Sequence, residues 1–288
     1  MSPAHLSLPL LLIAPVALGC AGNVSGSPGS GDVEATATHG LVVIQRTVDA
    51  VDGVHAEASA RFVSVPAWSS MSDAFRAIGA ALDLPEPGTC VSQSHPAGGT
   101  TGEVVPVVEL SDVGSVVLEV AGGATRLVPR QLPDVTDVVS GLVYARTTEA
   151  TFLPAAAPYV MHVGGASGLG AFDVEAVAPG DPSDVRVAGE DSMGPLTVSG
   201  PFVEISWSRD GSDDVVFTDV QPAGVRCVFS GDQATRGDGL AHGTVSTSLL
   251  DEAGTLVVHR LRREPMVAPG IADGEVRFDF ARSVPYVR

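Results

Sequence analysis

Along most of the chain, apolar and polar residues alternate with a period of two, which predicts strands that are buried on one face. In VHAEASARF (54–62), every second residue is apolar or small and the residues between are polar. The apolar segment LVVIQRTV (41–48) precedes it, and the linker DAVDG predicts a hairpin with Gly53 near its turn. A second hairpin is predicted from SVVLEV (115–120) and ATRLVPR (124–130), which two glycines join.

One segment has helical periodicity instead. In SMSDAFRAIGAALDLP (70–85), apolar residues recur at helical spacing from Phe75 to Leu82. Ser72 is the expected N-cap, and Pro85 marks the end of the helix. We expect its short apolar stripe to pack on the core of its own domain rather than on a partner.

From Pro158 onward, short strand patterns recur with Gly, Pro and Asp between them. This spacing is typical of an antiparallel sandwich or barrel, and the absence of alternating long helices excludes a doubly wound nucleotide fold. The predicted class is therefore all-β, with antiparallel β-sandwiches and one short helix. The Ala/Pro-rich LPAAAP predicts a boundary that gives an N-terminal β-rich domain (41–157) and a C-terminal sandwich (158–288). A single large sandwich is the alternative.

The N-terminus follows another pattern. Residues 6–18 form an apolar run, interrupted by two prolines, that is too short and too kinked to span a membrane. The small residues after it end in Cys20 and resemble the lipobox of bacterial lipoproteins. The resemblance implies that 1–19 is a signal peptide, that signal peptidase II cleaves before Cys20, and that Cys20 carries diacylglycerol and a fatty acyl chain such as palmitate. The Gly/Ser-rich segment 20–40 is then a flexible tether. Ordinary secretion through a small-residue cleavage site is the alternative.

A second resemblance concerns PFVEISWSRDGSDDVVF (201–217), where Trp207 lies in mid-strand before a polar turn and a β-branched strand. This arrangement resembles the core strand pair of immunoglobulin-like and fibronectin type III domains, and it implies an immunoglobulin-like sandwich for 158–288. As a whole, the chain resembles the β-rich envelope lipoproteins of high-GC Gram-negative soil bacteria. That resemblance implies no particular activity.

Charge and cysteine content narrow the function classes. The net charge of −18 argues against nucleic acid, which requires a basic face, and against polybasic binding to anionic lipids. Among the three cysteines, lipidation of Cys20 leaves Cys90 and Cys227 as one pair in an oxidising compartment, where a disulfide is expected. The alternative is that Cys227 is a small buried residue of a strand.

Two loops contain residues of types that occur in catalytic or metal sites. In HVGGASGLGAF (162–172), a nucleophile elbow at Ser167 would need glycine where Leu169 stands, so a flexible connection is favoured over catalysis. In RDGSDD (209–214), three carboxylates are suited to a calcium ion, whereas an Asp-Gly hairpin turn is the favoured interpretation. The candidate cation ligands are Asp210, Asp213 and Asp214.

One basic cluster stands out in this acidic chain. HRLRRE (259–264) either binds an anionic glycan or partner, or is matched by carboxylates of neighbouring strands. The seven histidines do not occur at metal-ligand spacing, and the sequence implies no metal and no cofactor.

These observations predict a lipid-anchored protein of the cell envelope, in the outer membrane, that acts as a binding or structural module and not as an enzyme. The expected partners are the membrane, through the lipid, and an envelope protein or glycan. The alternative is an envelope or extracellular hydrolase whose site is assembled from distant loops. An unpaired edge strand would favour a subunit of a larger outer-membrane assembly.

Overall fold

The computed structural model describes residues 35–49, 53–93, 108–121, 123–135, 139–149, 152–166, 168–182, 185–190, 194–208, 213–230 and 240–288. The predicted signal peptide, Cys20 and most of the predicted tether lie outside these ranges. No helix within them is long and apolar enough to cross a membrane.

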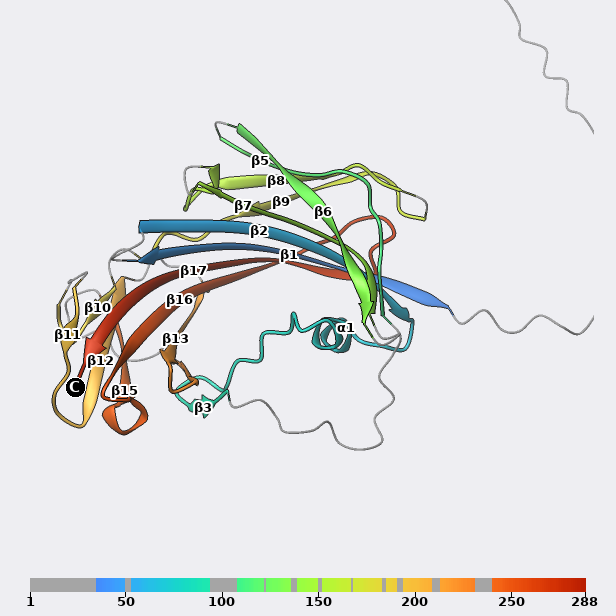
Figure 1. Cartoon of the computed structure of the whole chain (residues 1–288). Coiled ribbons are helices and arrows are strands. Elements are labelled where there is room, and N and C mark those ends of the chain that lie inside the picture. The colour runs from blue at the N-terminus through green and yellow to red at the C-terminus, as the bar shows by residue number, and fades with distance from the viewer. Residues whose placement is uncertain are drawn as a thin grey trace, which may run out of the picture. The chain divides into compact units, whose positions relative to one another are not determined.

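The described residues form one large mixed sheet, one small sheet and a short α-helix (Figure 1), which confirms the predicted all-β sandwich class. The large sheet has the order β3-β14-β13-β16-β17-β1-β2-β4-β7-β6-β5-β8-β9, with β11 beside β17. Its strands are β1 (Thr36–Asp49), β2 (Gly53–Pro66), β3 (Cys90–Ser92), β4 (Val108–Leu110), β5 (Val116–Val120), β6 (Gly123–Val135), β7 (Val139–Glu149), β8 (Pro158–Val163), β9 (Phe172–Val177), β11 (Leu196–Thr197), β13 (Val215–Gln221), β14 (Val225–Val228), β16 (Ala253–Pro265) and β17 (Asp273–Val287). The small sheet has the order β10-β12-β15, with β10 (Arg186–Val187), β12 (Phe202–Ser208) and β15 (Leu240–Ser246).

Both predicted hairpins are present. β1 and β2 pair antiparallel from Thr36 opposite Pro66 to Asp49 opposite Gly53, and β5 pairs antiparallel with β6. The large sheet is mixed rather than purely antiparallel, because β1 runs parallel to β17, β4 to β7 and β11 to β17. The β1–β17 pair joins the two ends of the described chain in the middle of the sheet.

The strand β6 changes partners along its length and thereby folds the sheet onto itself. Residues up to Leu127 pair with β5, whereas residues from Val128 onward pair with β7. As a result, β5, β8 and β9 lie over β1 and β2 (Figure 1). We call this the first sandwich; its core contains inward residues of both layers, such as Phe62, Tyr159 and Phe278.

The small sheet covers the other end of β16 and β17 and forms the second sandwich with β13. Ile205 and Trp207 of β12 pack there with Leu256 and Tyr286. Phe278 in the first core and Tyr286 in the second lie an even number of positions apart on β17, so both cores use the same face of the large sheet.

Arginines occupy this shared face between the two cores. Arg282 and Arg260 are buried and donate to the carbonyl oxygens of Val185 and Ser208, at 2.9 and 2.7 Å. Arg46 of β1 forms an ion pair with Asp181 at 2.7 Å. These three arginines therefore bind chain segments that lie between the two sandwiches.

The opposite face of the large sheet is covered by the helix α1 (Met71–Ala77) and by the strap, residues 79–89. Leu82 and Leu84 of the strap pack against buried residues of β13, β14 and β16. The helix lies within the predicted segment, but the expected N-cap at Ser72 was wrong. Ser70 is the cap, because its hydroxyl accepts from Asp73 N at 3.1 Å while the Asp73 carboxylate reaches back to Ser70 N.

The strand pairing bears on the predicted domain boundary and on the predicted hairpin at the Asp-Gly turn. The predicted boundary at residue 157 falls between β7 and β8, and strands from both sides of it build the first core. The expected hairpin across the Asp-Gly turn was wrong: β12 pairs with β10 and β15, whereas β13 pairs with β14 and β16. β12 and β13 thus belong to opposite layers of the second sandwich, and Trp207 and Val216 both face the core between those layers.

Candidate ligand pocket

The outer face of the small sheet carries a pocket. In β12, Val203, Ile205 and Trp207 are buried in the second core, so the alternating residues Phe202, Glu204 and Ser206 belong to the outer face. The pocket has a volume of about 360 Å³, which lies at the lower end of the range for small-ligand sites. It is lined by Arg186, Ala188, Gly189, Phe202, Glu204, Ser206, Leu240 and His242.

A carboxylate and an imidazole are held together in this pocket. His242 of β15 lies opposite Ser206, which is two residues from Glu204 on the same face of β12, and its Nδ1 is 2.6 Å from Glu204 Oε1. The His242 side chain is 8% exposed and that of Glu204 is 35% exposed. Glu204 and His242 therefore line the pocket as a hydrogen-bonded pair, which restrains the orientation of both side chains.

Two exposed side chains complete the lining. Arg186 of β10 lies opposite Ser206 on the other side of β12. Its guanidinium makes no hydrogen bond or ion pair within the described chain, and Phe202 is 61% exposed. The pocket thus combines a cation, an accessible aromatic ring and a hydrogen-bonded carboxylate.

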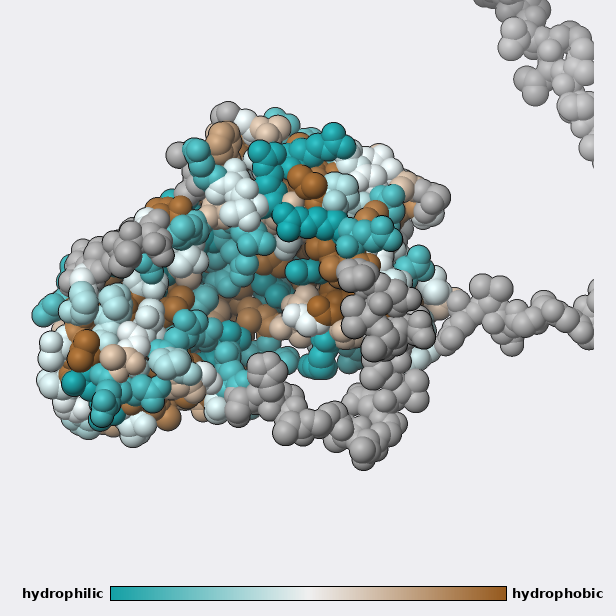
Figure 2. All heavy atoms as spheres, in the orientation of Figure 1, coloured by the Kyte–Doolittle hydropathy of each residue, from teal (hydrophilic) through white to brown (hydrophobic). Residues whose placement is uncertain are grey.

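A second polar cluster lies on the opposite face of the large sheet. His259 Nδ1 is 2.7 Å from Asp279 Oδ1, and its Nε2 is 3.8 Å from Asp219 Oδ2. Arg226 binds Asp219 through two bonds of 2.7 Å and lies 4.9 Å from the centroid of the Phe217 ring, which stacks on His259 at 4.3 Å. Figure 2 shows hydrophilic residues below the arched strands on this side. Because these groups already bind one another, the arrangement is suited to joining β13, β14, β16 and β17.

A third cluster is exposed on the outer face of the first sandwich. His162 of β8 has its Nδ1 2.8 Å from Asp173 of β9 and its Nε2 3.0 Å from Glu119 of β5. Hydrogen bonds with Asp173 and with Glu119 raise the pKa of His162 above its ordinary value of 6.5. The imidazolium would join three neighbouring strands.

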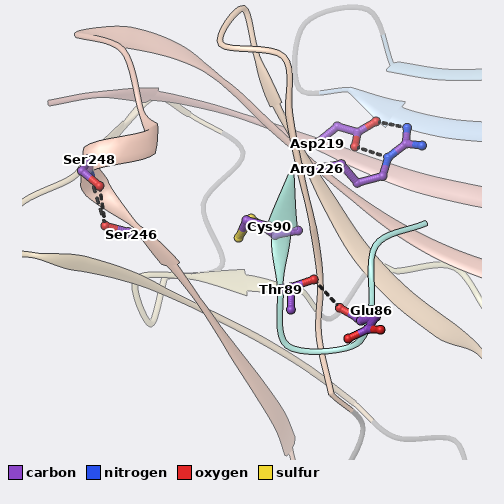
Figure 3. The surroundings of a disulfide bond; sticks show 8 residues. Glu86, Thr89, Cys90, Asp219, Arg226, Ser246 and Ser248 are labelled. Carbon is purple, nitrogen blue, oxygen red and sulfur yellow. Dashed lines mark hydrogen bonds and ion pairs between the residues drawn. A yellow bond between two sulfur atoms is a disulfide. The ribbon is translucent and has the colours of Figure 1, made fainter. Parts of the chain in front are cut away.

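The two cysteines considered from the sequence are joined. Cys90 of β3 lies directly opposite Cys227 of β14, and a disulfide connects them across 137 residues of sequence. Figure 3 shows Cys90 close to the doubly bonded Asp219–Arg226 pair, and the Thr89 hydroxyl donating to Glu86 O at 2.7 Å. The disulfide therefore fixes the end of the strap to the edge of the large sheet.

The predicted cation ligands are placed only in part. Asp214 accepts two hydrogen bonds from Arg262, at 2.7 and 3.1 Å, so its carboxylate is committed to an ion pair. Asp210 lies outside the described residues, as does Ser167 of the glycine-rich loop. Within the described chain, no group of three or more His, Cys, Asp or Glu side chains is arranged to hold a metal ion.

The basic cluster of residues 259–264 is divided between the two faces of β16. Arg262 binds Asp214 on the face of the two cores, whereas Arg263 lies 3.6 Å from Glu275 on the opposite face. Carboxylates from elsewhere in the chain thus match these two arginines, which agrees with the second of the two interpretations of this cluster.

The sequence did not single out the pocket residues. The only signal was the alternation in FVEISWS, which assigns Glu204 and Ser206 to the outer face. The approach of Arg186 and His242 to them depends on strand pairing.

No family model and no curated protein matches the sequence. One similar solved structure is the Fcho1 Mu homology domain of Danio rerio with a bound Eps15 peptide. It is 10% identical, with a TM-score of 0.25, over 88% of this chain and 97% of that one. A likeness at this level assigns neither a fold family nor a function.

Proposed function

We propose that this chain is a lipid-anchored binding module of the cell envelope, whose outer pocket binds an acidic sugar unit of an envelope glycan. The observation that carries the proposal is the lining of the pocket: Arg186, the Glu204–His242 pair and the exposed ring of Phe202 surround a volume of about 360 Å³.

Each lining group suits one part of such a ligand. A guanidinium pairs with the carboxylate of a uronic acid. A carboxylate held by an imidazole accepts hydrogen bonds from sugar hydroxyls, and an exposed ring covers the apolar face of the sugar. The proposed activity is binding and requires no catalytic group.

Titration calorimetry with D-glucuronic acid and D-glucose tests the pocket. We expect the wild-type protein to prefer the acid, and Arg186→Gln to remove that preference while Phe202→Ala weakens binding of both sugars. Arg126→Gln, at an exposed arginine of β6, is the matched control and should change neither affinity. An equal affinity for the two sugars in the wild-type protein would refute the proposed ligand class.

The lipid anchor is proposed from the lipobox-like sequence that ends in Cys20. Intact mass of the membrane-extracted protein should show an acylated N-terminal Cys20, and Cys20→Ala should release an unmodified soluble chain. An unmodified wild-type chain in the medium would instead support secretion.

A further inference from the structure

The strand β9 ends the large sheet, and no described strand pairs with its outer edge. Ala178 N donates to Ala157 O, which makes Pro158 and Val177 a non-hydrogen-bonded pair of the β8–β9 ladder. Hydrogen bonds to β8 therefore come from Phe172, Val174 and Ala176, and the backbone groups of the alternating residues point away from β8.

These outward groups have almost no partners in the described chain. The N–H and C=O groups of Asp173 and Glu175 make no hydrogen bond there, and Val177 O accepts from Arg262 Nη1 at 3.2 Å. The free stretch is thus bounded at one end by an arginine. It contains no proline, and prolines are a common protection of sheet edges.

The side chains on the outer face beside this edge are mainly carboxylates, and His162 of β8 lies between Asp173 and Glu119. Asp173, Glu175 and Glu119 lie on the same outer face, and Asp173 is 65% exposed even though it pairs with His162. Glu175 forms no ion pair within the described chain. On the inner face, Phe172, Val174 and Ala176 are 7 to 8% exposed, so they leave an apolar rim at the edge.

We propose that the β9 edge binds an extended peptide of a partner protein in which basic and apolar residues alternate. Such a peptide would add one strand to the sheet through the N–H and C=O groups of Asp173 and Glu175. Its basic side chains would lie beside the two carboxylates, and its apolar side chains would cover the rim formed by Phe172 and Val174. This site is separate from the outer pocket and does not depend on its ligand.

The test uses the full mature chain and the acetylated, amidated peptide Arg-Val-Arg-Val-Arg, labelled with fluorescein. We expect saturable binding by anisotropy, and slower hydrogen exchange at the amides of Asp173 and Glu175 when the peptide is present. Exchange at Glu149, an exposed residue of β7, should not change. Binding without protection of Asp173 and Glu175 would overturn the proposal.

Charge reversal separates this site from general attraction to an acidic protein. Glu175→Arg should weaken binding of the basic peptide about tenfold and improve binding of Glu-Val-Glu-Val-Glu. Glu149→Arg makes the same charge change elsewhere and should have little effect, and Arg186→Gln should have none. Equal losses in Glu175→Arg and Glu149→Arg would overturn the proposal. So would concentration-dependent self-association that Glu175→Arg abolishes, because the occupant would then be a second copy of the chain.

Discussion

The first and second sandwiches use the same face of the large sheet but are attached to it in different ways. In the first, β6 runs from the large sheet into the covering layer, so hydrogen bonds continue around the fold. In the second, the covering strands β10, β12 and β15 form a sheet of their own and pair with no other described strand. The stability of such a separate layer depends on its core and on the chain segments that connect it to the large sheet. Its outer face carries the pocket.

The two cores also differ in composition. The first contains linked aromatic pairs, with Phe62 close to Tyr144 and Phe172, and Phe278 close to Tyr159 and Phe280. The second has a tilted Trp207–Phe229 pair at 5.3 Å, and the disulfide adjoins it. The first sandwich is therefore stabilised by packing and by a continuous sheet, and the second by a smaller core together with a covalent link.

The largest expected effect comes from removing a ring of the first core. Phe278 is fully buried, so Phe278→Ala should lower the free energy of unfolding by about 3–5 kcal/mol. The matched control Phe202→Ala truncates an exposed ring in the second sandwich and should cost about 0.5 kcal/mol or less. Urea denaturation of both variants measures the difference, and a loss below about 1 kcal/mol for Phe278→Ala would contradict the assignment of the core.

Removal of the disulfide should affect the second sandwich. The double substitution Cys90→Ser and Cys227→Ser should cost about 2–4 kcal/mol, because the unfolded chain loses a long-range constraint. Hydrogen exchange should become faster in β13 and β14 and remain slow in β5 and β8. Equal acceleration in both places would show that the two sandwiches unfold as one cooperative unit.

A hydrogen bond inside the first sandwich should have a smaller effect. The Tyr144 hydroxyl donates to Asp112 at 2.8 Å and accepts from Val113 N at 2.9 Å; burial raises the pKa of Tyr144 to about 12. Tyr144→Phe leaves the buried Val113 N–H without its acceptor and should cost about 1–2 kcal/mol in urea denaturation. An unchanged midpoint would mean that water replaces the hydroxyl.

Alternation in the sequence predicted which residues face the cores, but not which strands become neighbours. β1 and β2 were found because a short linker joins them, whereas the β1–β17 pair brings His39 beside Asp273. A pattern of period two predicts which face of a strand is buried, but it does not predict which other strand pairs with it. This explains why the expected hairpin between β12 and β13 failed.

The pocket was hidden for a related reason. Glu204 and His242 are 38 residues apart, and each one alone is an ordinary outward-facing residue of a strand. Their pairing, and the approach of Arg186 from β10, exist only once the small sheet has formed. By contrast, the cysteine pair was recognisable because its residue type restricts the partner.

The smallest expected effect concerns His162 and the outer face of the first sandwich. Hydrogen bonds with Asp173 and Glu119 raise its pKa in the folded state above 6.5. A raised pKa means that this contribution to stability is fully present below pH 6.5 and is lost as the pH rises through the folded-state pKa. The free energy of unfolding should therefore decline over this range in the wild-type protein, and less so in His162→Gln.

His55 is the matched control, because it is an exposed histidine on β2. His55→Gln should keep the wild-type decline, which urea titrations at a series of pH values would measure. The side chains at the His162 cluster are 40 to 65% exposed, so solvent screens the ion pairs and the effect should be small and decrease with added salt. If His162→Gln left the pH profile unchanged, the link between β5, β8 and β9 would contribute nothing measurable, and the first sandwich would depend on packing and hydrogen-bond continuity alone.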